Sequence, residues 1–522
     1  MLFQDTVVVG TYQEVGSLNA IITHPSMSSV AAAPAGTIDG RRGSGKLKLK
    51  RVLAPLLNPA DGEPSSDPSS RAPTKPTKRT SHRPLYNATV LRGNESALMH
   101  DCLAARPWWR ETPEGEAFNL WWGGNGQGFD FASGFSDAAT ASSQPGTRVQ
   151  RARQLVNKFA HNCQICVKAR LAHNLRRYAR EAKLDLGSLV PLTFVVTAGE
   201  PDDAEYCRFK GAAAALASER GESVWIVKPR NMNRGIGIEV CESPKAVDAL
   251  LKKKKRGSQH VVQKYVERPL LVRGRKFDIR LYVLVTSDLK VFMYRDSYVR
   301  TCSTAYDAAN CADKSMHLTN DYVQKFLDSY GTHEDANKLS FDELQAIFRE
   351  EPLADGKVLS VADDLWPQMR RCVQATIACA LPHFPIMAPG GSGGGGSFEL
   401  YGLDFLVDAD GKVFLLEVNT SPALFRHGKV LTEMLPRMIE EVFQKAVDPH
   451  FPAPEGAAPP PPLDRYEQVD VDRSGCGGPP PPTYGGAVYE KKEPKTTKTS
   501  LKVAIERAAG GGARAARMLR EE

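Results

Sequence analysis

Three hard oxygen donors lie inside two apolar segments of the stretch YGLDFLVDADGKVFLLEVNTSP, residues 401–422. We predict that this stretch forms two strands joined by the polar DADG turn. Glu417 and Asn419 are two residues apart, so both side chains point to one face of an extended chain, and Asp404 can meet them from the neighbouring strand. Burying a carboxylate without a partner is unfavourable, and this oxygen set suits Mg²⁺ that also bridges substrate phosphates. The alternative is a pair with Lys or Arg at the end of a sheet.

A glycine-containing loop follows a predicted strand in VWIVKPRNMNRGIGIEV, residues 224–240. The strand ends near Lys228, a polar loop follows, and Gly235 and Gly237 precede a second strand. Glycines allow close approach of the backbone, and successive amides in such a turn can bind an anion. We interpret the segment as a flap over phosphates, and a plain hairpin is the alternative.

The segment KFDIR, residues 276–280, carries three charges at alternate positions. Lys276, Asp278 and Arg280 would therefore line one face of a strand, while the two residues between them are apolar. An exposed sheet face is one explanation. A cationic groove is the other, because Arg300 lies where the returning strand ends and can join Arg280 there.

Two further polar segments belong to the candidate site. VVQKYV, residues 261–266, ends a predicted strand where backbone groups can read an adenine edge, and Gln263 and Lys264 are its polar candidates. His317 and Asn320 both lie in the segment SMHLTNDYVQK. A lone His is more often structural than catalytic, so we interpret His317 as structural, whereas Asn320 can assist a metal or substrate.

The elements that must position these residues alternate between strands and helices from SLVPLTFVV onward. A helix is predicted at residues 243–253, where Ser243 is the N-cap and a proline occupies the first position. Residues 276–300 are predicted to form a long hairpin, and apolar periodicity predicts helices over residues 361–381 and 428–447.

Composition divides the chain into folded and unfolded parts. Residues 1–85 are a low-complexity arm that we expect to be disordered, and residues 448–522 are a Pro-rich, basic tail with the same expectation. Between them we predict an N-terminal α/β part at 86–200 and a second part at 201–447, with a flexible Gly-rich insert at 388–397.

The overall composition excludes several classes of protein. The net charge of +8 over 522 residues is too modest to indicate a nucleic-acid binder, although it favours acidic partners. We find no apolar run long enough for a membrane span, and no secretory signal. The ten cysteines have no regular spacing, so structural zinc is not favoured and an intracellular, reducing compartment fits best.

Taken in order, these motifs resemble those of a known family. WIVKP, NRGIGI, VVQKYVERPLL, KFDIRLYVLV, HLTNDYVQK and the opening strand pair closely resemble the ATP-grasp core of tubulin tyrosine ligase-like enzymes. The resemblance covers roughly residues 90–447. It implies an α+β, ATP-grasp fold with mixed and antiparallel sheets and flanking helices.

The resemblance also implies a reaction. In this family ATP phosphorylates a carboxylate, and the amine of an incoming amino acid displaces phosphate from the acyl phosphate to form an amide. By carry-over, Asp404, Glu417 and Asn419 would hold Mg²⁺. Arg280 and Arg300 would handle the acceptor or the amino acid. The nucleotide and its surroundings would be contacted by Lys168, Lys228, Gly235, Gly237, Gln263, Lys264, Tyr265, Val266, Lys276, Asp278 and Asn320.

The implied partners are tubulin, through its acidic C-terminal tail, microtubules, and a free amino acid, with no nucleic acid and no membrane. The wording of YVRTCS and of the segment after HLTN is more similar to the tyrosine ligases than to the polyglutamylases, so tyrosine is favoured. The alternatives are a polyglutamylase or glycylase, or a catalytically silent microtubule-binding protein. We expect a monomer in the cytoplasm, on the cytoskeleton or in a cilium.

Overall fold

The computed structural model describes residues 84–472, except 95, 125–127, 132–153, 222, 233 and 385–394. All described residues belong to one compact unit, Arg79–Glu522. The predicted disorder of residues 1–83 and 473–522 lies outside them. Among the helices of this described part, none combines the length and apolar character needed to cross a bilayer.

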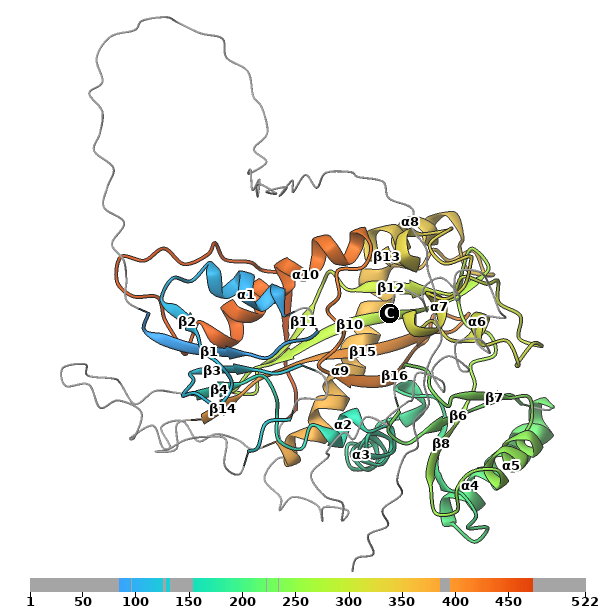
Figure 1. Ribbon diagram of the computed structural model, residues 1–522. Coiled ribbons are helices and arrows are strands. Elements are labelled where there is room, and N and C mark those ends of the chain that lie inside the picture. Colours follow the sequence, from blue (N-terminus) through green and yellow to red (C-terminus); the bar gives the residue numbers. More distant parts are fainter. Residues whose placement is uncertain are drawn as a thin grey trace, which may run out of the picture. The chain divides into compact units, whose positions relative to one another are not determined.

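A large antiparallel sheet, whose strands differ in length, forms the centre of this unit (Figure 1). Its longest strand, β10 (Arg275–Val285), pairs with β11 (Val291–Tyr294) and β12 (Tyr298–Thr301) on one side and with β15 (Glu399–Val407) on the other, and β15 pairs with β16 (Val413–Thr420). The predicted strand pair at 401–422 and the predicted hairpin at 276–300 are therefore present. The remaining strands of this sheet are β9 (Leu271–Val272), β13 (Lys338–Ser340) and β17 (Tyr466–Val469).

The two faces of β10 serve different purposes. Its odd-numbered residues from Phe277 to Val285 belong to a core that also contains residues of α8 (Phe341–Glu350) and α9 (Trp366–Ala380). On the other face, Tyr282 and Leu284 pack in a core shared with α10. The first half of that same face carries the three charged residues of KFDIR. The helices around this sheet are α6 (Lys314–His317), α7 (Asp321–Gln324), α8, α9 with a preceding turn at Val361–Leu365, and α10 (Lys429–Val442) with a following turn at Phe443–Val447.

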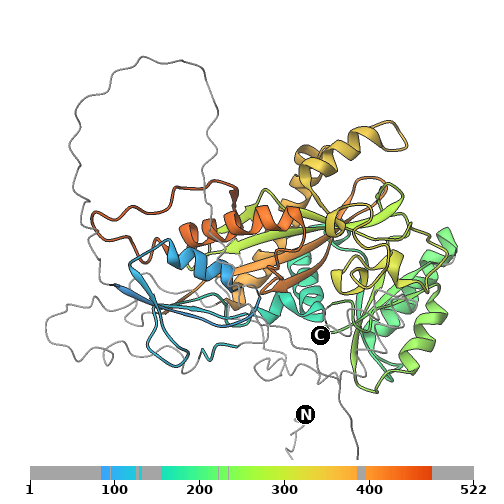
Figure 2. The same ribbon diagram turned by 45° about the horizontal axis from the view of Figure 1, so that its top comes forward.

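A second, four-stranded sheet lies beside the central one (Figures 1 and 2). Trp225 and Val227 of its strand β6 point into a core beneath α4 and α5, so the residues between them point to the opposite face. α3 covers part of that opposite face. The elements are β5 (Thr193–Thr197), β6 (Trp225–Pro229), β7 (Glu239–Cys241), β8 (Gln259–Lys264), α2 (Cys163–Cys166), α3 (Lys168–Glu181), α4 (Ala204–Arg220) and α5 (Pro244–Lys252). Ser243 caps α5 as predicted.

A small parallel sheet completes the described part and corrects one prediction. Residues 395–397, expected to belong to a flexible insert, form β14 and pair with β4. Their extended geometry is supplied by the neighbouring strand, because glycines alone carry little strand preference. The elements are β1 (Tyr86–Val90), α1 (Ala97–Ala104), β2 (Trp109–Glu111), β3 (Leu120–Trp122), β4 (Gln154–Val156) and β14 (Gly395–Ser397).

The predicted tail also begins too early. Residues after 447 continue as ordered chain, and β17 pairs antiparallel with β11 at the edge of the central sheet. Tyr466 and Val469 are 3% and 4% exposed. Glu467 accepts a hydrogen bond from the indole of Trp366 and pairs with Arg370, both in α9. The sequence analysis missed this strand because it is short and follows a Pro-rich segment with no periodic pattern.

We predict that β17 contributes strongly to stability. A chain that ends at Glu455 loses the burial of Tyr466 and Val469, which amounts to about 3 to 6 kcal/mol of unfolding free energy. It also exposes the backbone edge of β11 and should aggregate. Urea unfolding and light scattering, compared with a chain that ends at Asp472, measure both effects. Equal stability of the two chains would contradict this role.

Candidate nucleotide and acceptor site

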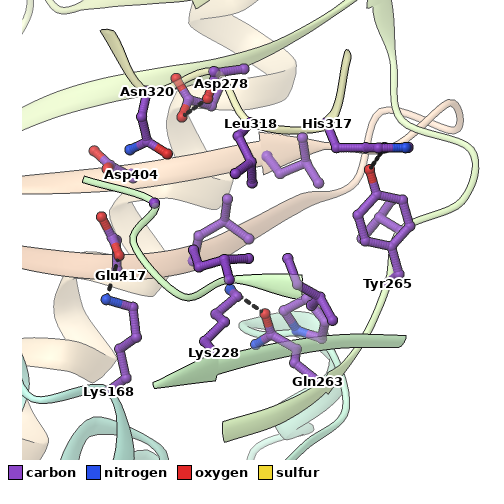
Figure 3. A pocket seen from close by; sticks show the side chains of 18 of the residues that line it. Lys168, Lys228, Gln263, Tyr265, Asp278, His317, Leu318, Asn320, Asp404 and Glu417 are labelled. Atoms are coloured by element: carbon purple, nitrogen blue, oxygen red, sulfur yellow. Dashed lines mark hydrogen bonds and ion pairs between the residues drawn. The ribbon is translucent and has the colours of Figure 1, made fainter. Parts of the chain in front are cut away.

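A pocket lies between the central sheet and the four-stranded sheet. Ile226, Lys228 and Gln263 reach it from β6 and β8, whereas the central sheet supplies its other wall. Figure 3 shows the carboxylates of Asp404 and Glu417 on adjacent strands, facing the side chains that come from the smaller sheet. Most of the predicted site residues line this pocket: Lys168, Lys228, Gly235, Gln263, Lys264, Tyr265, Val266, Lys276, Asp278, Asn320, Asp404 and Glu417.

Two buried lysines give the pocket its positive charge. Lys228 donates to the side-chain oxygen of Gln263 at 2.7 Å, and Lys276 donates to the hydroxyl of Tyr265 at 2.8 Å. No carboxylate oxygen of the described residues lies within ion-pair distance of either ammonium. Burial lowers the pKa of each lysine to about 8. A buried ammonium held only by neutral groups is poorly stabilised, so this arrangement favours an anionic ligand.

The carboxylates stand opposite each other on β15 and β16. Asp404 pairs in register with Glu417, and a β-bulge follows immediately, because Phe405 pairs with Leu415. The bulge leaves Leu416 unpaired in the ladder, and this residue lines the pocket beside Glu417. Glu417 forms an ion pair with Lys168 at 2.8 Å. The sequence therefore predicted the shared location of the two carboxylates correctly.

Asn419 lies at the edge of this pair, outside the pocket lining. Its amide nitrogen is 3.3 Å from both Asp404 Oδ2 and Glu417 Oε1. The described residues contain no group of three or more His, Cys, Asp or Glu side chains suited to a metal. Two carboxylates with an amide are still a donor set that Mg²⁺ accepts when water and phosphate complete its shell. The metal assignment remains a prediction.

The structure does not show the cationic groove that we expected from Arg280 and Arg300. Both guanidiniums are buried outside the pocket lining and are already paired. Arg300 binds Asp278 through two hydrogen bonds of 2.7 and 2.6 Å and contacts Asp404 at 2.9 Å. Arg280 binds Asp404 at 2.5 and 3.1 Å. The expectation failed because Asp278 and Asp404, which lie on neighbouring strands, already neutralise these arginines.

These arginines set the charge of Asp404. Burial alone would raise the pKa of this carboxyl, but the charges of Arg280 and Arg300 and their hydrogen bonds outweigh burial and hold it well below its ordinary value. Asp404 is therefore an anion at neutral pH. Thr319 completes the network by donating to Asp278 at 2.6 Å.

The loop after β6 closes over one side of the pocket. Arg234, Gly235 and Gly237 all have positive φ angles, which glycine adopts without strain. A Cβ on Gly235 would come within 3.3 Å of the side-chain oxygen of Asn320. Lys168 donates to the carbonyl of Met232 at 2.9 Å and so holds the loop. Gly237 shapes the loop but does not line the pocket.

Lys264 is occupied differently from the prediction. Its ammonium pairs with Glu267 at 2.6 Å and also donates to the carbonyls of Val224 and Tyr265. It lines the pocket without offering a free charge to phosphates. Glu267, three residues further along, was the signal that sequence reasoning overlooked.

Several pocket residues were missed by the sequence prediction. Leu406 lies two residues after Asp404 on β15, so strand alternation alone would have placed it on the pocket face. Ile226 lies two residues before Lys228 on β6, so alternation would also have placed it on the pocket face. Leu416 had no such signal, because its position depends on the bulge. These side chains give the pocket an apolar wall between its charged ends.

The comparison with protein families decides the identity of the fold. The model described as "Tubulin-tyrosine ligase family" matches residues 147–455, more than half of the chain. The chain belongs to the tubulin-tyrosine ligase family. This confirms the predicted family and the predicted α+β, ATP-grasp-type fold with mixed sheets and flanking helices.

Individual relatives in this family are similar over parts of their length. Tubulin glycylase 3E of Tetrahymena thermophila is 35% identical over 252 residues, which are 46% of this chain and 17% of that protein. Human tubulin polyglutamylase TTLL7 is 32% identical over 289 residues, 53% of this chain and 30% of that protein. The probable alpha-tubulin polyglutamylase Ttll1 of T. thermophila is 26% identical over 67% of this chain and 83% of its own. The chain thus spans less than a third of the first two. The names of these relatives favour the polyglutamylase or glycylase alternative over the tyrosine reading.

We predict that Arg300 mainly stabilises the sheet and Asp404. Arg300→Lys keeps the charge but cannot bind Asp278 with two parallel hydrogen bonds and also reach Asp404, so it should lower the free energy of unfolding by about 1 to 3 kcal/mol. Urea unfolding measures this difference. Arg465→Lys is the matched control, because Arg465 pairs with Asp296 at an exposed site, where such a change costs less than about 1 kcal/mol. Equal stabilities of the two variants would contradict the assignment.

Proposed function

We propose that the chain is an ATP-dependent carboxylate–amine ligase that adds an amino acid to tubulin. The observation that carries the proposal is that two buried lysines and two carboxylates line one pocket without forming ion pairs with each other. Within the described part of the chain, Lys228 and Lys276 form no ion pair with a carboxylate, whereas Asp404 is held as an anion beside Glu417. Such a site suits a ligand that is itself anionic and arrives with a divalent cation.

The residues of the chain would divide the work as follows. Lys228 and Lys276 would donate to the triphosphate, and the loop that carries Gly235 would limit access of water. Asp404, Glu417 and Asn419 would hold Mg²⁺, which when bound spreads and neutralises charge on the transferred phosphoryl group. The segment from Gln263 through Val266 would contact the nucleobase at the end of β8.

The reaction would join two substrates in sequence. An acceptor carboxylate attacks the γ-phosphorus and ADP leaves, and the amine of the amino acid then displaces phosphate from the acyl phosphate. Arg280 and Arg300 would act by keeping Asp404 charged and by holding Asp404 and Asp278 in place. This replaces the direct contact with acceptor or amino acid that we expected from the sequence.

For the amino acid, we propose glutamate or glycine attached to side-chain carboxylates of the tubulin tail. The support is the naming of the relatives as polyglutamylases and glycylases. The net charge of +8 favours an acidic partner of this kind. A location on cytoplasmic or ciliary microtubules and a monomeric state are further expectations.

Product analysis tests the activity. Purified tubulin incubated with the protein, ATP, Mg²⁺ and a mixture of amino acids should gain one kind of residue, identified by mass spectrometry of the tails. We expect glutamate or glycine. Incorporation of tyrosine would overturn the amino-acid proposal, and tight tubulin binding with no product would favour the catalytically silent alternative.

Glu417→Gln should abolish product formation while leaving the fold intact. The substitution keeps the volume of the side chain but removes the charge that would face Mg²⁺ and that now pairs with Lys168. Activity should fall by at least about a hundredfold at moderate Mg²⁺, corresponding to roughly 3 kcal/mol of transition-state stabilisation. Circular dichroism checks the fold. Near-normal turnover would contradict the metal assignment.

ATP binding should weaken as the pH rises above about 8. Lys228 and Lys276 have pKa values of about 8, below the ordinary value, and the proposed ligand binds their charged forms. In the unfolded chain these two lysines keep their protons up to a higher pH. Their burial therefore destabilises the folded protein most below about pH 8, and the nucleotide-free protein gains stability as the pH rises above that value. The rise in melting temperature caused by ATP should therefore shrink between about pH 7.5 and 9.5. The Lys228→Met variant should lose part of this pH dependence. If the ATP-induced rise in melting temperature of the parent protein stays the same over this pH range, the assignment of the two lysines to the nucleotide site is wrong.

A further inference from the structure

A series of hydrogen bonds in the wall of the pocket ends on the ammonium of Lys276. Lys276 Nζ lies 2.8 Å from the hydroxyl oxygen of Tyr265, and that oxygen lies 2.7 Å from His317 Nδ1. The other ring nitrogen, His317 Nε2, lies 2.8 Å from the carbonyl oxygen of Asn310. Figure 3 shows the Tyr265–His317 contact at the end of the pocket.

In this series of hydrogen bonds, each donor and acceptor can be assigned in one way. The carbonyl of Asn310 can only accept, so His317 Nε2 carries a hydrogen. Burial lowers the pKa of His317, so the imidazole is neutral and its Nδ1 is an acceptor. The hydroxyl of Tyr265 must then donate to His317, which leaves its oxygen lone pairs free to accept from Lys276.

Packing holds the three side chains in this arrangement. Tyr265, Lys276 and His317 are all buried, and the rings of Tyr265 and His317 meet edge to face at 5.5 Å. The Lys276 ammonium also lies 4.4 Å from the centre of the Tyr265 ring. Among the described residues, this hydroxyl is the sole acceptor within hydrogen-bond distance of that ammonium, so its other two N–H groups are available to a ligand.

We propose that His317 and Tyr265 are positioning residues that orient the charged end of Lys276 toward the phosphates of the nucleotide. This rests on the proposed ligase function and assigns a role to two side chains beyond it. His317, which the sequence indicated as structural, orients the Tyr265 hydroxyl. That hydroxyl in turn fixes the direction of the ammonium, so the loss of either contact frees Lys276 to rotate within the pocket.

Two substitutions at His317 separate positioning from packing. In His317→Asn the side-chain oxygen lies near the place of Nδ1 and can accept from Tyr265, but the side chain no longer reaches Asn310. In His317→Gln the amide reaches the carbonyl of Asn310 but offers no acceptor at the Nδ1 position. Tyr265→Phe removes the central hydroxyl. Tyr330→Phe is the matched control, because it removes a hydroxyl from another buried lysine, Lys338, which does not line the pocket.

The experiment measures ATP affinity by calorimetry and the melting temperature without ATP for all four variants and the parent. His317→Gln and Tyr265→Phe should bind ATP about tenfold more weakly, as expected for the loss of one charge-assisted contact. His317→Asn should bind within about twofold of the parent, and Tyr330→Phe should bind like the parent.

The outcomes distinguish this inference from the proposed function. If the parent does not bind ATP, the proposed function fails, and the inference fails with it. If the parent binds ATP and the Asn and Gln variants bind equally well or equally badly, the positioning role is wrong while the nucleotide site stands. Should His317→Gln fail to fold, Tyr265→Phe still tests the same contact to Lys276, and unchanged affinity in that variant would overturn the proposal.

Discussion

The central sheet depends on a buried network of two arginines and two aspartates. Arg280 and Arg300 neutralise Asp404 and Asp278 where β12, β10 and β15 lie side by side. Each of these charges would be costly to bury alone, and removing one partner leaves the others uncompensated. The network therefore fixes the register of three strands and, through the depressed pKa of Asp404, also fixes the charge at the wall of the pocket. Structure and chemistry share the same four side chains.

The pocket exists because two sheets each turn one polar patch toward the other. β10 has apolar residues along one face from Phe277 to Val285, whereas its other face is charged at Lys276 and Asp278 and apolar from Tyr282 onward, where α10 covers it. β6 likewise buries Trp225 beneath its helices and presents Lys228 to the pocket. The two pocket lysines thus belong to different sheets. A ligand that binds both would stabilise the arrangement of the sheets as well as occupy the site.

Sequence reasoning succeeded where the signal was local. Local patterns along the chain were enough to predict β10, β15 and β16, the meeting of Asp404 with Glu417 from a neighbouring strand, and the glycine-containing loop beside the pocket. It failed where a partner distant in sequence or a local irregularity decided the outcome. The pairing of Arg300 with Asp278 depends on strand register, the place of Leu416 depends on a bulge, and β14 and β17 take their extended form from neighbouring strands. Neither propensity nor composition contains that information.

The edge strand β17 also bears on how the chain reaches its folded state. β17 pairs with β11, which precedes it by more than 170 residues, and buried Arg106 pairs with Glu440 and Asp448 across an even larger separation. Contacts this distant in sequence close large loops and form slowly. During synthesis the edge of β11 stays uncovered until β17 has left the ribosome, and an uncovered edge can pair with another chain. The last strand of the central sheet therefore ends the period in which a nascent chain is most exposed to aggregation.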